Sequence, residues 1–346
     1  MHIAIDTTPL DSGHKDRGVG MYTKLLIEAL EKYGSNHSYY FFTRGQKIPN
    51  DIELIHYPYF DPFFITLPFV YSKPTVVTVH DLIPLVFPEH FPAGIRGALK
   101  WHYQRMKLTR VSRIIADSES SKRDIERIAG APESRIDVVH LAPSSQYRPV
   151  TSESLLSAIK TKYKLPEKFI LYIGDVNWNK NIVGLLQAFQ YLKAQIKLVL
   201  AGKAFMNSSL AEAKDIQSQI NFLGIRDRVI TPGFISFEDL PALYSLACVY
   251  IQPSHYEGFG LPVLEAMACG TPVVSSRASS LAEIAGPAIT VDPSDSQDIA
   301  RGLLEALTMT PVKRKALIHA QTQWVQRFFW ERVAHQTIAS YEKTLA

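Results

Sequence analysis

The sequence predicts an α/β protein of two domains, each with a mostly parallel sheet covered by helices on both faces. Short apolar runs, typical of buried strands, alternate with longer helical stretches along most of the chain. The length of 346 residues is too great for one typical domain and suits two. A polar stretch containing several serines and prolines, residues 143–165, interrupts this pattern and is the predicted linker.

The first domain, residues 1–150, begins with a buried strand at residues 2–6 and a helix at 21–33. That helix carries Tyr22, Leu26 and Leu30 on one face, the spacing of an amphipathic helix. Further strands are predicted at 39–43, 53–56, 75–79, 113–116 and 136–139, and further helices at 95–110 and 118–128.

The second domain, residues 151–325, repeats the alternation. Ser236 and Asp239 form a near capping box, which predicts that a helix begins there. Residues 309–346 are helical in tendency. The predicted strands are 169–173, 197–201, 228–230, 247–252, 272–275 and 288–291. We therefore expect two Rossmann-like domains that face each other across a cleft.

Composition excludes several classes of protein. Residues 1–150 hold 18 Lys and Arg against 16 Asp and Glu, so neither half has the basic excess of a nucleic-acid-binding domain. Two cysteines cannot build a disulfide framework, and no Cys/His spacing suggests a metal site. The chain shows no signal peptide and no long apolar run, which predicts a cytoplasmic protein.

Residues 254–283 contain the densest cluster of candidate site residues. A buried strand leads into a loop with Glu257, Gly258 and Gly260, and a short helix that Pro262 opens then carries Glu265. The backbone N–H groups at the start of this helix would favour a phosphate. Taken alone, the two glutamates are more simply explained as a solvated loop acid and an acid that complements the helix dipole.

This stretch, E-G-F-G-L-P-V-L-E-A-M-A-C-G-T-P-V-V, resembles the signature of the retaining glycosyltransferases of family 4, which have the GT-B fold. The resemblance implies that Glu265 holds the donor's ribose hydroxyls and Glu257 the hexose hydroxyls. It also implies that backbone amides of Gly258, Phe259, Gly260 and Leu261 hold the phosphates and sugar. In such enzymes the last helix, here residues 326–346, crosses back to the first domain.

His80 and Asp81 directly follow the predicted strand at 75–79, where ligands of parallel sheets bind. A His next to an Asp is also common as a structural pair. The wording V-H-D-L-I-P-L resembles family 4 enzymes, several of them mannosyltransferases, in which this His contacts the donor sugar. The resemblance therefore adds His80 and Asp81 to the catalytic candidates and makes GDP-mannose the leading donor, with UDP-glucose second.

Lys180 matches a lysine that the family presents to the donor diphosphate, but Asn179 stands where the family has an arginine. Lys203 and Arg277, each just after a predicted strand, are candidates to replace that cation, or are ordinary surface charges. Because no D-x-D occurs in the chain, we expect no metal bridge to the diphosphate. We expect no cofactor, because the nucleotide sugar is the donor substrate.

Gly18 and Gly20 stand at the mouth of the first helix and indicate an anion or sugar site. They come too late after the first strand for a dinucleotide fingerprint, which argues against a nicotinamide enzyme.

An aromatic, proline-broken stretch at residues 57–71 is followed by six Lys and Arg without an acid from Arg96 to Arg113. These features predict either a packed loop with a solvated basic helix or peripheral contact with acidic lipid at the inner face of the membrane.

The predicted function is metal-independent, retaining transfer of a hexose from a nucleotide sugar to a hydroxyl of a glycan or lipid-linked acceptor. No nucleic acid is expected as a partner. A sugar-nucleotide isomerase or phosphorylase of the same fold, and a non-catalytic sugar-nucleotide-binding partner, stay open as alternatives.

Overall fold

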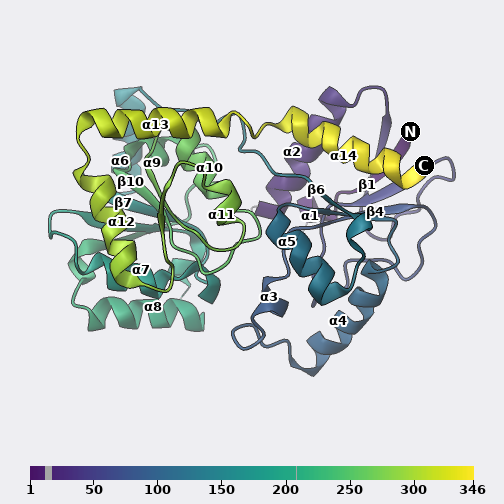
Figure 1. Cartoon of the computed structure of the whole chain (residues 1–346), viewed down its shortest axis with the longest axis horizontal. Helices are drawn as coiled ribbons and strands as arrows, with labels where there is room; N and C mark the ends of the chain where they lie inside the picture. The colour runs from purple at the N-terminus through teal and green to yellow at the C-terminus, as the bar shows by residue number, and fades with distance from the viewer. Residues whose placement is uncertain (12–17, 208) are drawn as a thin grey trace. The chain divides into compact units, whose positions relative to one another are not determined.

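A computed structural model describes residues 1–11, 18–207 and 209–346 and confirms the predicted α/β class. The chain forms two compact units (Figure 1): Met1–Ala142 with Phe328–Ala346, and Pro143–Arg327. The first boundary thus lies eight residues before the one expected from the sequence, and the second lies two residues after it. Each unit holds a six-stranded parallel sheet.

The first unit has the strand order β2-β1-β3-β4-β5-β6. Its strands are β1 His2–Asp6, β2 Ser38–Phe42, β3 Leu54–Tyr57, β4 Thr75–Val79, β5 Arg113–Ala116 and β6 Ile136–Val138. Its helices are α1 Thr8–Asp11, α2 Gly18–Tyr33, α3 Ile83–Val86, α4 Gly94–Leu108, α5 Glu119–Asp124 and α14 Trp330–Leu345, with a π-turn at Ile125–Ala129 and a 3₁₀ turn at Glu133–Arg135. The inner strands β3 and β4 are buried along their whole length, as a sheet covered on both faces requires.

The C-terminal helix α14 belongs to this first unit, where it packs beside α2 (Figure 1). Its Tyr341 is fully buried, and the hydroxyl lies 2.7 Å from Nδ1 of His56 on β3. Lys343 pairs with Asp137 at 2.7 Å. Burial lowers the pKa of His56 to about 3, so this histidine is neutral inside the unit.

The second unit has the order β12-β11-β10-β7-β8-β9. Its strands are β7 Phe169–Ile173, β8 Lys197–Ala201, β9 Val229–Gly233, β10 Val249–Gln252, β11 Val273–Ser276 and β12 Ile289–Val291. Its helices are α6 Glu153–Lys162, α7 Ile182–Phe189, α8 Ala211–Phe222, α9 Leu240–Leu246, α10 Leu261–Ala268, α11 Leu281–Ile284, α12 Ser296–Thr308 and α13 Pro311–Val325, with 3₁₀ turns at Trp178–Lys180, Lys203–Met206 and Arg226–Arg228. One face of this sheet packs on α7, α8 and α12, and α10 covers β10 and β11.

Strand order determines where a ligand can enter the second unit. The chain lays down β7, β8 and β9 in one direction, then returns to the other side of β7 to place β10. The connections that follow β7 and β10 therefore diverge above the sheet. Such a switch point leaves a crevice at the carboxyl ends of the strands, where ligands of these folds bind.

Each predicted strand is present, with ends shifted by at most three residues, but three local expectations are wrong. The expected linker contains helix α6, capped by the Ser152 hydroxyl and packed on α9 in the second unit. Because this helix contains several serines and buries little apolar surface, its sequence resembles that of a linker. Ser236, unlike Ser152, does not cap a helix. Helix α9 begins only at Leu240, and the Ser236 hydroxyl donates to Asp239 instead. Finally, α10 begins at Leu261 after the N-cap Gly260, so Pro262 is its second residue.

Candidate functional site

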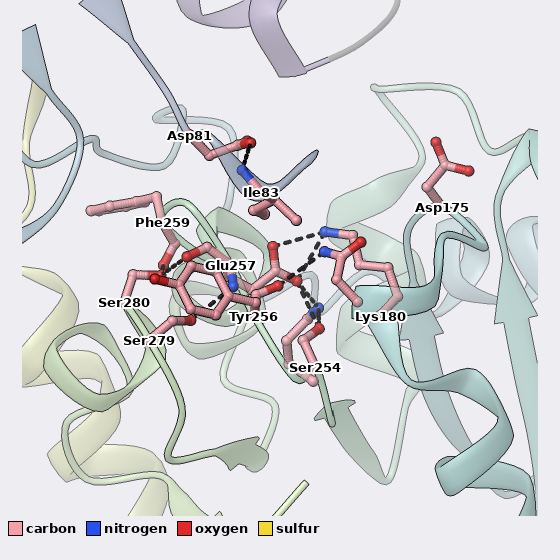
Figure 2. A network of polar contacts seen from close by, with 12 residues as sticks. Asp81, Ile83, Asp175, Lys180, Ser254, Tyr256, Glu257, Phe259, Ser279 and Ser280 are labelled. Carbon is pink, nitrogen blue, oxygen red and sulfur yellow. Dashed lines mark hydrogen bonds and ion pairs between the residues drawn. The ribbon is translucent and has the colours of Figure 1, made fainter. Parts of the chain in front are cut away.

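The switch point of the second unit brings Lys180 and Glu257 together, 77 residues apart in the chain. Lys180 ends the short 3₁₀ turn after β7, and Glu257 lies in the loop after β10. The Lys180 Nζ lies 2.9 and 2.7 Å from the two Glu257 carboxylate oxygens (Figure 2). The sequence indicated each residue separately but not this ion pair.

Glu257 is 6% exposed, and burying a charged group is costly unless hydrogen-bond donors or an opposite charge surround it. Gln252 at the end of β10 donates its Nε2 to Oε1 at 2.8 Å. The Ser254 hydroxyl donates to the same oxygen at 2.7 Å (Figure 2). Lys180 is the cation that balances the charge. Since Oε1 already accepts three hydrogen bonds, including the one from Lys180, a ligand hydroxyl would have to approach Oε2.

Two serines hold the loop that carries Glu257 (Figure 2). The Ser279 hydroxyl accepts from the Glu257 amide at 2.8 Å, and the buried Ser280 hydroxyl lies 2.9 Å from the carbonyls of both Glu257 and Phe259. Both come from the connection between β11 and α11. Sequence reasoning missed them, although a pair of adjacent serines three and four residues after β11 was a readable signal.

Gly260 closes this loop and is the N-cap of α10. Its φ is +102°, a conformation that glycine adopts without strain, and a Cβ there would come 2.4 Å from Cδ2 of Leu281. Phe259 is buried, and Leu261 is the first helical residue. The loop is therefore fixed before a ligand arrives, with the first turn of α10 directly behind it.

Asn179, which stands where the resembled family has an arginine, has a structural role in this chain. Its buried side chain donates to the Tyr256 carbonyl at 2.9 Å, and its own carbonyl accepts from the His255 amide at 2.8 Å. These bonds join the loops after β7 and β10. Asn179 therefore supplies rigidity where the family supplies charge.

The two other candidate cations differ in availability. Arg277 pairs with Asp292 at 2.9 Å and lies 3.8 Å from Asp298, so its charge is already compensated. Lys203 is exposed at the start of the turn after β8. Within residues 1–11, 18–207 and 209–346, no cluster of three His, Cys, Asp or Glu is placed to hold a metal ion.

Glu265 is the fifth residue of α10 and is 9% exposed, facing buried tyrosines. Tyr244 donates its hydroxyl at 2.9 Å, and Tyr147 is hydrogen-bonded to the same carboxyl. Burial raises the pKa of Glu265 to about 7, although these hydrogen bonds act in the opposite direction. Its protonation thus changes near neutral pH. Tyr250 lies in ring contact with Tyr244 and hydrogen-bonds Gln252, which connects this carboxyl to the surroundings of Glu257.

The first unit places His80 against Asp117 and not against Asp81. Register sets Val79 on β4 opposite Ala116 on β5, so the residues that follow these strands become neighbours. His80 Nδ1 lies 2.6 Å from Asp117 Oδ2, and its Nε2 lies 3.2 Å from the Pro58 carbonyl. Asp117 could have been found by the argument that selected His80, because it too directly follows a strand.

Burial alone would lower the pKa of His80, but the Asp117 carboxylate beside it raises the pKa above its usual value. Asp81 accepts the Ile83 amide at 3.0 Å and so shapes the start of α3 (Figure 2). Gly18 and Gly20 are the first and third residues of α2, while the preceding polar loop, residues 12–17, lies outside the described residues.

Comparison with known proteins gives matches along most of the chain. Residues 157–324 match the family described as glycosyl transferases group 1, and residues 32–142 match glycosyltransferase family 4. The chain is 35% identical over 275 residues to O-antigen chain mannosyltransferase B of Escherichia coli, covering 77% of this chain and 70% of the relative.

A second relative and a solved structure extend this result. Identity is 31% over 283 residues to the serotype-specific mannosyltransferase WbdA of Escherichia coli, covering 78% of this chain and only 34% of that protein. The structure of sucrose-phosphate synthase from Thermosynechococcus elongatus superposes with a TM-score of 0.78 at 22% identity, covering 99% of this chain and 98% of that one.

We expect the unfolding free energy of the protein to fall as the pH rises from about 4.5 to about 7, because the folded state retains the Glu265 proton that the unfolded state has released. The raised pKa corresponds to roughly 3 kcal/mol over this interval. Glu265→Gln removes this contribution, so its stability should decline less across the same interval. Chemical denaturation at several pH values measures the unfolding free energy of the parent and of each variant, with Glu238→Gln, at an exposed position, as control. Parallel curves for the parent and Glu265→Gln would contradict the raised pKa.

Asp117→Asn should lower the pKa of His80, because burial then acts without the carboxylate that opposes it most strongly. NMR titration of the histidine rings measures the change, with the His80 signal assigned by its loss in His80→Gln. Asp51→Asn, at an exposed residue that pairs with His2, is the control and should leave His80 unchanged. If the His80 pKa is the same in Asp117→Asn, Asp117 is not the group that raises it.

Proposed function

The chain belongs to the glycosyltransferases of group 1 and family 4, and from this premise we propose that it transfers mannose from GDP-mannose to an acceptor hydroxyl. The acceptor would be a glycan or lipid-linked glycan, and the anomeric configuration would be retained. The observation that carries the proposal is the Lys180–Glu257 pair at the switch point of the second sheet, next to the first turn of α10. Both the V-H-D-L-I-P-L motif and the names of the two mannosyltransferase relatives support mannose as the transferred sugar.

The charges around Lys180 suit a diphosphate that bridges two sources of positive potential. Two short contacts commit Lys180 to Glu257, which leaves at least one of its three N–H donors for a phosphate oxygen. The first-turn amides of α10 supply the second source. Since the pair itself is close to neutral, the helix and the remaining lysine donor would together stabilise the leaving diphosphate.

The remaining roles are those that the family resemblance implies. Oε2 of Glu257 has capacity for a hexose hydroxyl, and the carboxyl of Glu265 for the ribose hydroxyls. His80 would contact the donor sugar, with Asp117 fixing its orientation through Nδ1. We assign no enzyme nucleophile: the departing phosphate oxygen accepts the acceptor's proton on the same face of the sugar. No metal is assigned, because the chain has no D-x-D to bridge one to the diphosphate.

The decisive assay supplies GDP-mannose or UDP-glucose with a mannose-terminated oligosaccharide. We expect GDP release and an α-linked product only with GDP-mannose and acceptor together, and unchanged turnover in excess EDTA. Conversion of the sugar nucleotide without acceptor would indicate an isomerase. A requirement for inorganic phosphate would indicate a phosphorylase, and binding without turnover would indicate a non-catalytic partner. Transfer to the acceptor from UDP-glucose but not from GDP-mannose would reverse the donor assignment. Loss of turnover in EDTA that Mn²⁺ restores would contradict metal independence.

Substitution at the ion pair tests the diphosphate role of Lys180. Lys180→Met should weaken GDP binding roughly 10- to 100-fold, the range of one charge-assisted contact. It should also cost about 1–3 kcal/mol of unfolding free energy, because the buried Glu257 carboxylate loses its cation. This cost is specific to the ion pair, since surface substitutions away from such features usually cost little. Calorimetric titration with GDP and chemical denaturation measure the two effects.

The double variant Lys180→Met with Glu257→Gln separates structure from binding. Neutralising both partners should restore much of the lost stability but none of the GDP affinity. Lys203→Ala is the matched control, an exposed lysine at a neighbouring strand end, and should bind GDP as the parent does. If Lys180→Met binds GDP like the parent while Lys203→Ala does not, the phosphate role belongs to Lys203.

A further inference from the structure

Large exposed apolar side chains gather in one part of the first unit. Five of them belong to two segments, residues 63–71, here named the aromatic loop, and helix α4. Their exposed fractions are Phe64 65%, Phe69 72%, Val70 78%, Ile95 83% and Leu99 68%. Single exposed apolar residues are ordinary on a soluble surface, but a contiguous group marks a binding face.

The aromatic loop and α4 form one surface because α4 holds the loop in place. Gln104 of α4 is fully buried and donates its Nε2 at 2.8 Å to the carbonyls of Asp61 and Phe64. Lys107 bonds the Phe69 carbonyl. Because these polar contacts satisfy the loop backbone from the inside, the loop presents its phenylalanines outward on a fixed support.

Side-chain contacts connect the two segments at the surface. Lys100 Nζ lies 5.0 Å from the centre of the Phe64 ring, and the rings of Phe69 and Tyr103 are 5.3 Å apart. On a helix, Ile95 and Leu99 are one turn apart on the same stripe, and Leu99 is one turn from Tyr103. The exposed stripe of α4 therefore continues directly into the aromatic loop.

Charge decides what this face would bind. Helix α4 carries Arg96, Lys100, Arg105 and Lys107 and no acid, and Arg110 follows it. Arg96 lies in the first turn, where a cation opposes the helix dipole, so helix stability does not explain it. The acid of the adjoining segment, Asp61, accepts from the amides of Phe63 and Phe64. Aromatic and aliphatic side chains next to these cations complement a surface that is apolar below and anionic above.

We propose that the aromatic loop and the exposed stripe of α4 form a membrane-binding face that sits at the headgroup level of a bilayer containing anionic lipid. Phe64, Phe69 and Leu99 enter the boundary between headgroups and acyl chains, while Arg96 and Lys100 contact lipid phosphates. In the part of the chain that the structure describes, no helix has the length and apolar character to cross a bilayer, so this contact would be peripheral. The proposal is independent of the transfer reaction, although a lipid-linked acceptor would make the two compatible.

Flotation with lipid vesicles tests the face. The intact protein should bind vesicles of phosphatidylcholine mixed with phosphatidylglycerol at least tenfold more tightly than vesicles of phosphatidylcholine alone, and added salt should weaken that preference. Phe69→Ser with Leu99→Ser should lower affinity at least tenfold for both vesicle types. Arg96→Gln with Lys100→Gln should remove only the preference for phosphatidylglycerol. All four side chains lie on the surface, so melting temperature is expected to stay near the parental value.

The matched control carries Phe222→Ser and Lys315→Gln, an exposed aromatic and an exposed cation of the second unit, and should bind vesicles like the parent. GDP affinity should be unchanged in every variant, which separates this test from that of the proposed function. The proposal is overturned if the parent ignores both vesicle types, or if the Phe69 and Leu99 variant floats like the parent. It is also overturned if sedimentation shows a dimer that this variant dissociates while vesicle binding is absent, since the face would then join two copies of the chain.

Discussion

The buried carboxylate of Glu257 is the constraint on which the candidate site of the second unit depends. An ionised group with so little exposure is tolerated only when donors surround it, and here they come from β10, from the residues after β10 and from Lys180 after β7. Meeting this demand locks two loops together at the point where the strand order reverses. Asn179 and the serine pair after β11 strengthen the same junction. The site is therefore organised before any ligand binds, which reduces the ordering cost of binding.

The first unit also holds a pair of oppositely charged groups at the ends of neighbouring strands, here a histidine and an aspartate. His80 and Asp117 follow neighbouring parallel strands, and each compensates the other in a place where neither would keep its charge alone. Parallel sheets generate such pairs readily, because the carboxyl ends of all their strands lie at one edge. In both units the candidate chemistry stands at this edge, whereas the hydrophobic clusters pack on the faces of the sheets. A closely paired charge also limits what remains for a ligand, which is why we assign part of the diphosphate binding to the amides of α10.

Much of the fold could be predicted because strand and helix patterns are local. The mostly apolar runs at Thr75–Val79 and Phe169–Ile173 coincide with β4 and β7, since a strand buried on both faces is a near-continuous hydrophobic run. The pattern failed where burial is slight: α6 buries only Ile159, so its polar surface looked like a linker. It also failed at the start of α10, where the N-cap is Gly260, which has no side chain to accept a hydrogen bond.

The sequence by itself determined the α/β class, the strands and the residues that follow them, because hydrophobic periodicity and glycine-marked loops depend only on near neighbours along the chain. It also determined the family resemblance, through the spacing of Glu257 and Glu265. Only the tertiary structure decided the partners: Lys180 with Glu257, His80 with Asp117, and Glu265 among buried tyrosines. These contacts join residues separated by 77, 37 and 21 positions, and the register and order of strands set them. Burial, which fixes the charge of such groups, is likewise a property of the folded chain and not of its local sequence.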